Sequence, residues 1–435
     1  MSVLTFKGGV HPIEGKELSK SVAIRSIQPK GEVVLAMGQH IGAPATPVVN
    51  VGDYVLVNQK VGSGEGFVTA NIHSPVSGTV KAIEPRMLSN GNKVMAVVIE
   101  NDEKYQILED SIECDNSRES ILNAIKEAGI VGMGGAGFPA HVKLAPKNPD
   151  AIEYIIVNGA ECEPYLTSDY RRMMESPEMI VEGLNIILSL FKNAKGIIAI
   201  EDNKMDAIIN MRGYIKDYDR ISIKTVYTKY PQGGERTLIK AVVDREINSK
   251  MLPADVGCIV NNIDTVCAIY NAVEKNKPLT KRIITISGDA INVPCNLEVP
   301  IGTSISQLIE EAGGFKKEPE KIISGGPMMG TAIYDINTPV TKGTSAILCF
   351  SKDEVALYEP SNCINCGRCA SVCPAHVIPS RIAMHAEHGN TEDFIKLHGM
   401  ECCECGCCSY ICPAKRNLTQ SIKTMRKNIL SSRKK

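Results

Sequence analysis

One cysteine pattern occurs twice in this chain and constrains its fold more than any other feature. Cys363, Cys366, Cys369 and Cys373 have the spacing C-x2-C-x2-C-x3-C, and a proline follows the last of them. The same spacing and the same proline recur in a second quartet that consists of Cys402, Cys405, Cys408 and Cys412. Two-residue gaps let successive thiolates of a tight turn converge on one iron–sulfur cubane. This part of the chain is therefore expected to fold around two such cubanes.

In proteins with two of these motifs, the fourth cysteine of each motif reaches the other cluster. We therefore predict two [4Fe–4S] clusters with crossed ligands, one bound by Cys363, Cys366, Cys369 and Cys412, and the other by Cys373, Cys402, Cys405 and Cys408. A zinc site is the alternative, but it typically uses two C-x2-C pairs separated by a longer loop. We interpret the surplus cysteines, Cys403 and Cys407, as packing residues beside the clusters.

Composition agrees with metal-bound rather than disulfide-bonded cysteines. The start of the chain, MSVLTFKGGVHPIEGKE, lacks a basic region followed by an apolar stretch, so no secretory signal is expected. The chain is then made and kept in the cytoplasm, where clustered cysteines more often bind metal than form bridges. No apolar run is long enough to span a bilayer. The net charge of −1 predicts no nucleic-acid partner.

Residues 29–100 are predicted to be all β. Within residues 1–111, VNVGDYVLVNQKVG and HSPVSGTVKAIEP resemble the two halves of a biotinyl/lipoyl-type barrel-sandwich hybrid domain. In carrier domains of that family, a lysine on the hairpin between the halves takes the cofactor. Here that position has the sequence GSGEGFVTANI, without a lysine. The resemblance therefore implies a docking or structural role rather than a swinging arm.

The remaining chain is predicted to form four further segments. Residues 112–280 alternate helical patterns with strand candidates such as EYIIV and GIIAI, which indicates an α/β domain with a parallel sheet. Residues 281–350 have a hairpin, helix, strand pattern typical of a small α+β module. Residues 351–415 hold the cysteine motifs and two short helical segments, and residues 416–435 form a basic tail. The predicted fold class is therefore multidomain α/β and α+β.

The basic tail has the pattern of an amphipathic helix. Leu418, Ile422, Met425 and Ile429 recur at i, i+4, i+7 and i+11, which places them on one helix face. Residues 413–435 also contain eight Lys or Arg and no Asp or Glu. Such a helix could lie on an anionic membrane or dock to a partner subunit, and a frayed, solvated tail is the alternative.

A glycine-rich loop in the α/β segment suggests contact with a flat or phosphorylated ligand. Gly132, Gly134 and Gly137 match G-x-G-x-x-G. A dinucleotide fingerprint would follow a strand and open a helix, whereas a helical pattern precedes this loop and Pro139 follows it. Four glycines in six positions nevertheless favour a backbone that approaches a ligand closely over a flexible turn.

The motifs GMGGAGFPAHVK, IIVNGAECEPYLTSDY, YPQGGERTL and VNNIDTV resemble the flavin-binding core of the NADH-oxidising subunit of NADH:quinone oxidoreductases. The full order, with FKGGVHP first and the two ferredoxin motifs last, resembles the family of the C subunit of the Rnf complex. That complex is a membrane-bound, ion-translocating ferredoxin:NAD oxidoreductase. The resemblance implies an FMN- and NAD(H)-binding α/β domain, a soluble-ligand-binding β-grasp module and a domain of the two-cluster ferredoxin type.

The resemblance also implies site residues. The glycine loop would lie along non-covalently bound FMN, with Lys143 near its phosphate. The flavin site would be completed by Asn158, Glu161, Asn261, Asn262 and Thr265. Phe138 and Glu163 would face the nicotinamide nucleotide, with Glu235 nearby. An aromatic ring can stack on the nucleotide, carboxylates can accept from ribose hydroxyls, and lysine provides a point charge for phosphate.

Several positions depart from the NADH-dehydrogenase pattern. Ala160 occupies the place of an aspartate, Cys162 that of a serine, and Gly234 that of the first residue of a Glu-Glu pair. The segment SKMLPADVG lacks the phenylalanine that shapes the nucleotide pocket in that family. These departures leave the FMN prediction intact and affect the details of NAD binding.

The family resemblance implies an electron-transfer subunit that lies peripherally on the cytoplasmic side of the cell membrane. Its partners would be NAD(H), membrane subunits and a ferredoxin-like cluster subunit of the Rnf complex, and indirectly ferredoxin. Electrons would pass between the two clusters and FMN, which exchanges hydride with NAD(H) and needs no acid–base catalytic residue. The alternatives are a soluble flavin and iron–sulfur corrinoid reductase of propanediol metabolism and a non-enzymatic electron adaptor.

Overall fold

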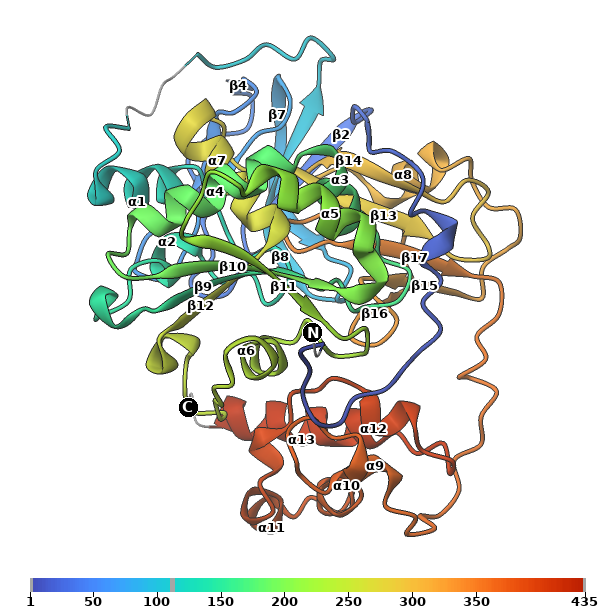
Figure 1. Ribbon diagram of the computed structural model, residues 1–435. Coiled ribbons are helices and arrows are strands. Elements are labelled where there is room, and N and C mark those ends of the chain that lie inside the picture. Colours follow the sequence, from blue (N-terminus) through green and yellow to red (C-terminus); the bar gives the residue numbers. More distant parts are fainter. Residues whose placement is uncertain (1–2, 110–113, 433–435) are drawn as a thin grey trace.

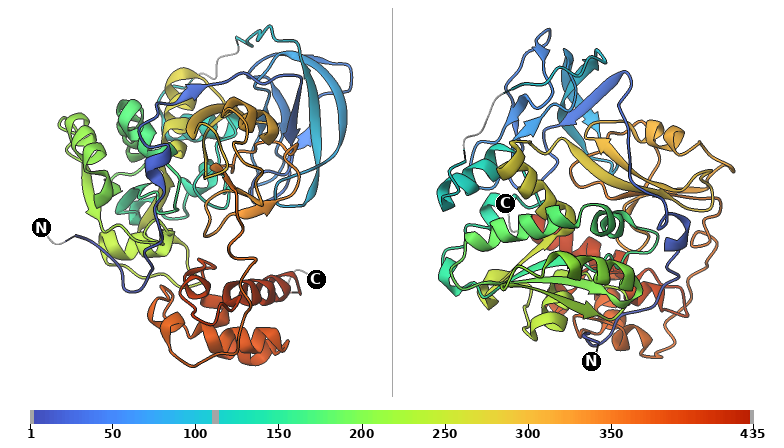
Figure 2. Two further views of the ribbon diagram at one scale, coloured as in Figure 1. Left: turned by 90° about the vertical axis from the view of Figure 1, so that its right-hand side faces the viewer. Right: turned by 45° about the horizontal axis from the view of Figure 1, so that its top comes forward.

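The computed structural model describes residues 3–109 and 114–432. It has two lobes: an upper one that contains the β-sheets and a lower one of short helices (Figure 1). An extended linker, orange in Figure 2, joins the lobes at one side, and the first residues of the chain run between them. The predicted boundary at residues 111 and 112 lies outside the described residues.

Two antiparallel sheets form the N-terminal barrel-sandwich unit, with strand orders β2-β8-β7-β4 and β3-β5-β6. Val33, Leu35, Val97 and Ile99 are fully buried in the core of this unit. The strands are β2 (Glu32–Ala36), β3 (Thr46–Pro47), β4 (Tyr54–Val55), β5 (Lys60–Ser63), β6 (Ile72–His73), β7 (Gly78–Met87) and β8 (Lys93–Asn101).

A four-stranded parallel sheet of order β11-β10-β9-β12 forms the α/β unit. The middle parts of its central strands are apolar because helices cover both faces. The strands are β9 (Tyr154–Gly159), β10 (Lys195–Glu201), β11 (Ile221–Val226) and β12 (Cys258–Asn262). The helices are α1 (Arg118–Glu127), α2 (Ala140–Lys143), α3 (Ser168–Glu175), α4 (Pro177–Ser189), α5 (Met205–Tyr214), α6 (Glu235–Val243) and α7 (Ile263–Lys275), with 3-10 turns at Pro149–Ala151, Asp202–Lys204 and Pro253–Val256.

The third unit is a six-stranded mixed sheet of order β1-β14-β13-β17-β15-β16, packed on α8 (Ile305–Glu311). Its edge strand β1 (Arg25–Ser26) comes from the N-terminal segment and pairs in parallel with β14. The predicted α+β module thus recruits a strand from outside residues 281–350. The other strands are β13 (Lys281–Ser287), β14 (Cys295–Pro300), β15 (Lys321–Ser324), β16 (Thr331–Ile333) and β17 (Ala346–Phe350).

The lower lobe has more helices than the two short segments predicted, because proline and glycine divide the cysteine region into several helices. They are α9 (Arg368–Ser371), α10 (Pro379–Glu387), α11 (Thr391–Lys396), α12 (Cys407–Tyr410) and α13 (Leu418–Ser432), with a 3-10 turn at Gly399–Glu401. Within the described ranges, no helix is both long and apolar enough to cross a membrane.

The predicted amphipathic helix of the tail is present as α13, but its apolar face is already occupied. Leu418, Ile422, Met425 and Ile429 are buried in the core of the lower lobe, where α13 packs against α10. A frayed tail is therefore wrong for residues 418–432, and this stripe is not free to lie on a membrane or a partner. The last three basic residues, 433–435, lie outside the described part.

The first residues of the predicted domain 1–111 do not pack with the barrel. Residues 4–10 run along the end of β11, where isolated β-bridges join Leu4 to Val226 and Val10 to Tyr230. Further on, Lys16 at the start of a 3-10 turn (Lys16–Leu18) is buried and donates its Nζ to the carbonyl oxygens of Glu161 and Leu166, at 2.8 and 2.6 Å. These residues form a strap over the α/β unit.

Candidate functional site

The carboxyl edge of the parallel sheet is where a ligand is expected. The chain runs from β9 outward to β10 and β11, then returns to add β12 on the other side of β9. Crevices at such a reversal of strand order, beyond the carboxyl ends of the strands, are the usual binding sites of open α/β sheets. Asn158 is the second-last residue of β9 and is paired in register with Asn262 at the end of β12. Three predicted flavin contacts, Asn158, Asn261 and Asn262, therefore meet at this crevice.

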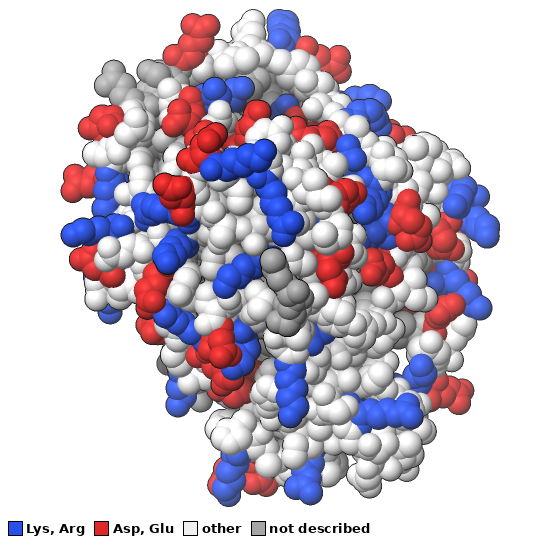
Figure 3. Space-filling model, viewed as in Figure 1, with Lys and Arg blue, Asp and Glu red and all other residues white. Residues whose placement is uncertain are grey.

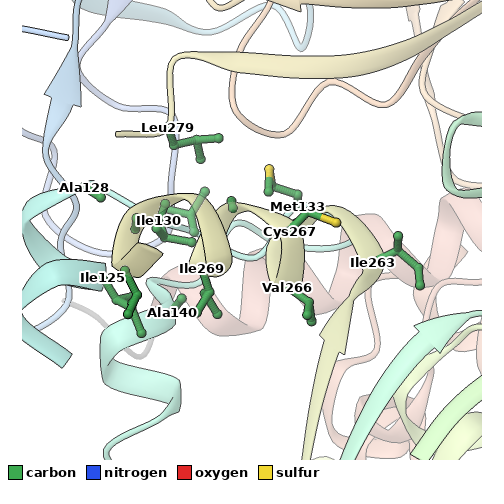
Figure 4. Close-up of a cluster of buried hydrophobic side chains, with 14 of the residues drawn as sticks. Ile125, Ala128, Ile130, Met133, Ala140, Ile263, Val266, Cys267, Ile269 and Leu279 are labelled. Atoms are coloured by element: carbon green, nitrogen blue, oxygen red, sulfur yellow. The ribbon is translucent and has the colours of Figure 1, made fainter. Parts of the chain in front are cut away.

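The glycine loop lies at the same edge because its flanks are anchored in the core. Met133 and Ala140 are buried among Val266, Cys267 and Ile269 of α7, as Figure 4 shows. The loop is closed by a hydrogen bond from Gly132 N to Phe138 O at 2.8 Å, and Met133 N donates to Thr265 Oγ1 at 3.0 Å. The apolar flanks thus hold the intervening glycine backbone against the start of α7.

Gly134 and Gly135 differ in how much space a side chain would have at each position. A Cβ on Gly134 would lie only 2.8 Å from the Cβ of Asn262, so a side chain there would collide with the end of β12. A Cβ on Gly135 would meet nothing within 4 Å. Gly134, Gly135 and Ala136 are exposed. The outer backbone of the loop is therefore open to a ligand, as the sequence predicts.

Neighbouring asparagines at the end of β12 play different roles. Asn262 is the N-cap of α7: its Oδ1 accepts from Asp264 N at 2.9 Å, and its Nδ2 donates to Asp169 Oδ2 at 2.7 Å. Asn261 is only 2% exposed, yet neither its Oδ1 nor its Nδ2 has a partner among the described residues. A buried amide without partners costs about 1–3 kcal/mol. The residues at this crevice therefore fit a polar ligand such as FMN.

Lys143 and Glu235 lie close enough for their charges to interact. Lys143 ends α2, and its Nζ donates to Val260 O at 2.9 Å. Burial lowers the pKa of Lys143, while the nearby Glu235 carboxylate acts in the opposite direction. Glu235 is exposed and is the first residue of α6. A cation and the amino end of a helix at one edge are suited to an anionic group.

The Glu161 carboxylate is bound by backbone amides at the start of α3. Its carboxylate accepts from Asp169 N at 2.7 Å and Tyr170 N at 3.3 Å, so it stabilises the first turn of α3. Burial raises the pKa of Glu161, whereas the ammonium groups of Lys16 and Lys204 lower it. The predicted flavin contact would compete with these bonds.

Glu163 holds the α+β module in place. Its carboxylate accepts from Met328 N at 3.1 Å and Met329 N at 3.0 Å, in the loop between β15 and β16. Burial raises the pKa of Glu163 to about 7. Glu163, a predicted nucleotide contact, is therefore hydrogen-bonded to the neighbouring α+β module. Phe138, the other predicted nucleotide contact, is half-buried at the end of the glycine loop.

One turn, Tyr230–Glu235, touches both the crevice and the lower lobe. On the crevice side, Asn158 Nδ2 donates to Gly233 O at 2.8 Å, and Gly233 N donates to Cys162 Sγ at 3.2 Å. On the other side, Tyr230 is 1% exposed and packs with Cys405, Cys407 and Val10. The motif resemblance indicated Glu235 but not Tyr230, although the motif YPQGGERTL already contained this tyrosine.

The cysteine motifs are partly brought together. Burial, together with the nearby thiols of Cys402 and Cys373, raises the pKa of Cys408 to about 11. Cys373 comes from the first motif, so its place beside the second motif agrees with crossed ligands, which remain a prediction. Cys405 instead lies with Cys403 and Cys407. In the described residues, no three Cys, His, Asp or Glu side chains are arranged as a finished metal site.

The other quartet lies nearer the surface. Cys363 and Cys366 are exposed, and Cys369 is buried in the small core against which Cys412 packs. Ser361 N donates to Ala414 O at 3.0 Å, which aligns the two segments that hold Cys363 and Cys412. The thiol donor set fits iron–sulfur clusters.

On the face shown in Figure 3, charged side chains of both signs are dense on the upper lobe and sparser on the lower one.

Family models match successive parts of the chain in the order that its units occur. They are the RnfC barrel sandwich hybrid domain over residues 4–104, the Nuo51 FMN-binding domain over 125–271, the SLBB domain over 283–332 and a 4Fe-4S dicluster domain over 355–415. The predicted fold class and the predicted FMN and [4Fe–4S] cofactors are thereby confirmed. The fold and site thus define an iron–sulfur flavoprotein.

Two relatives show to which family of iron–sulfur flavoproteins the chain belongs. The chain is 44% identical over 99% of its length to the C subunit of the Na(+)-translocating ferredoxin:NAD(+) oxidoreductase complex of Acetobacterium woodii, of which it covers 98%. It is 44% identical over 87% of its length to the C subunit of the proton-translocating complex of Clostridium ljungdahlii, of which it covers 84%. The chain belongs to the RnfC family, the C subunits of Rnf-type ferredoxin:NAD oxidoreductase complexes.

A solved structure shares the fold. The crystal structure of NAD+-reducing [NiFe]-hydrogenase in the air-oxidized state matches with a TM-score of 0.51 and 20% identity, over 65% of this chain and 55% of the other. The family membership, which includes the barrel-sandwich domain, decides against the corrinoid reductase alternative.

Proposed function

We propose that this chain is the electron-transfer subunit of an ion-translocating ferredoxin:NAD⁺ oxidoreductase, peripheral on the cytoplasmic side of the membrane, where it binds other subunits of the complex. The named relatives, which belong to Na⁺- and proton-translocating complexes, support this role. FMN bound in the crevice would link the one-electron chemistry of the clusters to hydride exchange with NAD(H).

The observation that carries the proposal is the double contact of the Tyr230–Glu235 turn. Gly233 in this turn binds Asn158 of the crevice, while Tyr230 packs against Cys405 and Cys407. The flavin crevice and one predicted cluster therefore lie on opposite sides of a single turn. In this arrangement the cluster of Cys405 is the inner one, and the cluster of the exposed Cys363 and Cys366 is the outer one.

The residues of the crevice have matching roles. The open backbone of the glycine loop and the free amide of Asn261 would bind the flavin, and Lys143 would bind its phosphate. Asn262 and Thr265 would act indirectly, since the first caps α7 and the second holds Met133 N. The chain thus orients the ring and supplies no acid–base group.

The site assignment can be tested with Cys369→Ala, which removes one ligand of the outer cluster. The purified wild-type protein should contain about eight irons and one FMN, and the variant about four irons. NADH should still bleach the flavin of the variant, while onward transfer to or from an iron–sulfur partner should fail. The measurements are iron, sulfide and flavin content and the absorbance change on adding NADH.

Cys349→Ala is the matched control, because Cys349 is a fully buried cysteine of β17 outside the motifs. This control should keep about eight irons. If NADH no longer reduced the flavin of Cys369→Ala, the two sites would not be separate as proposed. If the wild-type protein contained the clusters but did not respond to NADH, only the non-enzymatic electron adaptor would remain as an interpretation.

A further inference from the structure

The barrel-sandwich unit reaches the glycine loop of the α/β unit. Ile41 N donates to Gly137 O at 3.2 Å, and a Cβ on Gly137 would lie 3.4 Å from His40 Cα. The hairpin tip of the barrel, residues 64–69, lies beside this contact, because Ala43 N donates to Val68 O at 3.0 Å. Two loops of the N-terminal unit therefore border the outer end of the glycine loop.

Large apolar side chains on these loops are left exposed. Phe67 at the hairpin tip is 75% exposed and Ile41 is 46% exposed. The backbone carbonyl of Phe67 also lies against the His141 imidazole at the start of α2, where burial lowers the pKa of His141 and this carbonyl raises it. An open aromatic side chain thus belongs to a loop that contacts α2, directly after the glycine loop with its exposed residues Gly134, Gly135 and Ala136.

The two loops are held in place by a buried lysine. Lys342 N donates to Gln39 Oε1 at 2.8 Å, and Lys342 Nζ donates to Asn71 O at 2.6 Å and to Gly129 O at 2.7 Å. Asn71 follows the hairpin tip, Gln39 precedes Ile41, and Gly129 precedes the glycine loop. Lys60 of β5 also forms an ion pair with Glu127 of α1. The distance between the barrel loops and the glycine loop is therefore set in advance.

The position of this ring indicates which part of a ligand it meets. The orphaned amide of Asn261 marks the inner end of the crevice, where a ring that reacts with the flavin must lie. The opposite end of a dinucleotide must then pass the glycine loop toward solvent, where Phe67 and Ile41 stand. An aromatic side chain gains most from stacking on a flat heteroaromatic base.

We propose that the barrel-sandwich unit forms the outer wall of the dinucleotide site, with Phe67 stacking on the adenine base of NAD(H). This inference rests on the proposed function and gives the N-terminal unit a binding role. Ile41 packs at the side of the base. The specificity for a full dinucleotide then comes from a unit outside the flavin-binding fold.

The test is the binding of ADP-ribose, which has the adenosine half without the nicotinamide, to the FMN-loaded full chain by isothermal titration calorimetry. Phe67→Ala should raise the dissociation constant about three- to tenfold. Phe67→Trp, which keeps a stacking ring, should bind at least as tightly as the wild type. Val51→Ala, at an exposed apolar position of the same unit, is the matched control and should change nothing.

A second measurement compares NADH with reduced nicotinamide mononucleotide as reductants of the flavin. Phe67→Ala should raise the KM for NADH and leave the KM for the mononucleotide unchanged, at unaltered FMN content. Phe67 is exposed, so its truncation is not expected to disturb folding. Equal ADP-ribose binding by wild type and Phe67→Ala would overturn the inference. If neither NADH nor the mononucleotide reduced the flavin of the wild-type protein, the proposed function would be overturned instead.

Discussion

Neighbouring asparagines at residues 261 and 262 show how much one position matters at the end of a strand. Alternate residues of a strand point to opposite faces, so consecutive identical side chains enter different environments. Asn262 is satisfied by Asp169 and by the first turn of α7. Asn261 is buried without a partner among the described residues. One asparagine therefore serves the fold, and the other is available to a ligand.

This difference predicts opposite results for the two alanine variants. Asn261→Ala should leave the stability of the FMN-free chain unchanged or raise it, because an unpaired buried amide is removed, and should weaken FMN binding at least about tenfold. Asn262→Ala should cost about 1–2 kcal/mol of stability through loss of the α7 cap. Urea unfolding and flavin fluorescence titration measure the two effects. A large loss of stability in Asn261→Ala would show that its amide has a structural partner.

Among the elements, α13 has a clear division between a packed and a free face. Ile422 is 1% exposed and contacts the core of the lower lobe, whereas Leu430 is 45% exposed on the same helix. The core also contains Cys369, Cys373 and Cys408. The helix therefore supports the cluster ligands through packing.

Ile422→Ala should destabilise the lower lobe by about 2–4 kcal/mol, because it leaves a cavity in a small core. We expect earlier loss of the iron–sulfur absorbance on heating, with the FMN of the upper lobe retained. Leu430→Ala is the matched control and should be within about 0.5 kcal/mol of the wild type. Equal effects of both substitutions would show that α13 is not packed as described.

At the scale of the whole molecule, three units meet at Lys342. Its ammonium group binds carbonyl oxygens of the barrel-sandwich and α/β units, while its own backbone belongs to the α+β module. Burial lowers the pKa of Lys342 from 10.5 to about 7. Since the unfolded chain binds this proton more tightly, the contribution of Lys342 to stability rises with pH from about 7 to 10.5.

Lys342→Met should remove this pH dependence. Between pH 7 and 9, the free energy of unfolding of the wild type should rise relative to the variant, by at most about 1.4 kcal/mol per pH unit. Two buried carbonyl groups lose a donor, so the variant should also be less stable at every pH. Chemical unfolding at several pH values gives the comparison. Parallel pH profiles of the two proteins would contradict the titration of Lys342.

The sequence by itself determined the features that depend on local spacing. The two cysteine motifs, the glycine loop, the alternation of strands and helices and the apolar stripe of α13 are short-range patterns, so they could be recognised without coordinates. These patterns were sufficient for the fold class and the two clusters, and the motif resemblance added FMN and NAD(H). Asn158, Asn261 and Asn262 were indicated by the motif resemblance, and they lie at the carboxyl ends of β9 and β12.

Only the tertiary structure decided what each polar group contacts. The packing of α13 on α10 uses the stripe that could equally have met a membrane or a partner. Glu161 and Glu163 have the motif of ligand contacts, but they bind the amides of α3 and of the loop before β16. The contacts of Phe67 with α2 and of Tyr230 with Cys405 join residues far apart in sequence. Such pairings depend on how the units dock, because burial and hydrogen bonding are shared between distant segments.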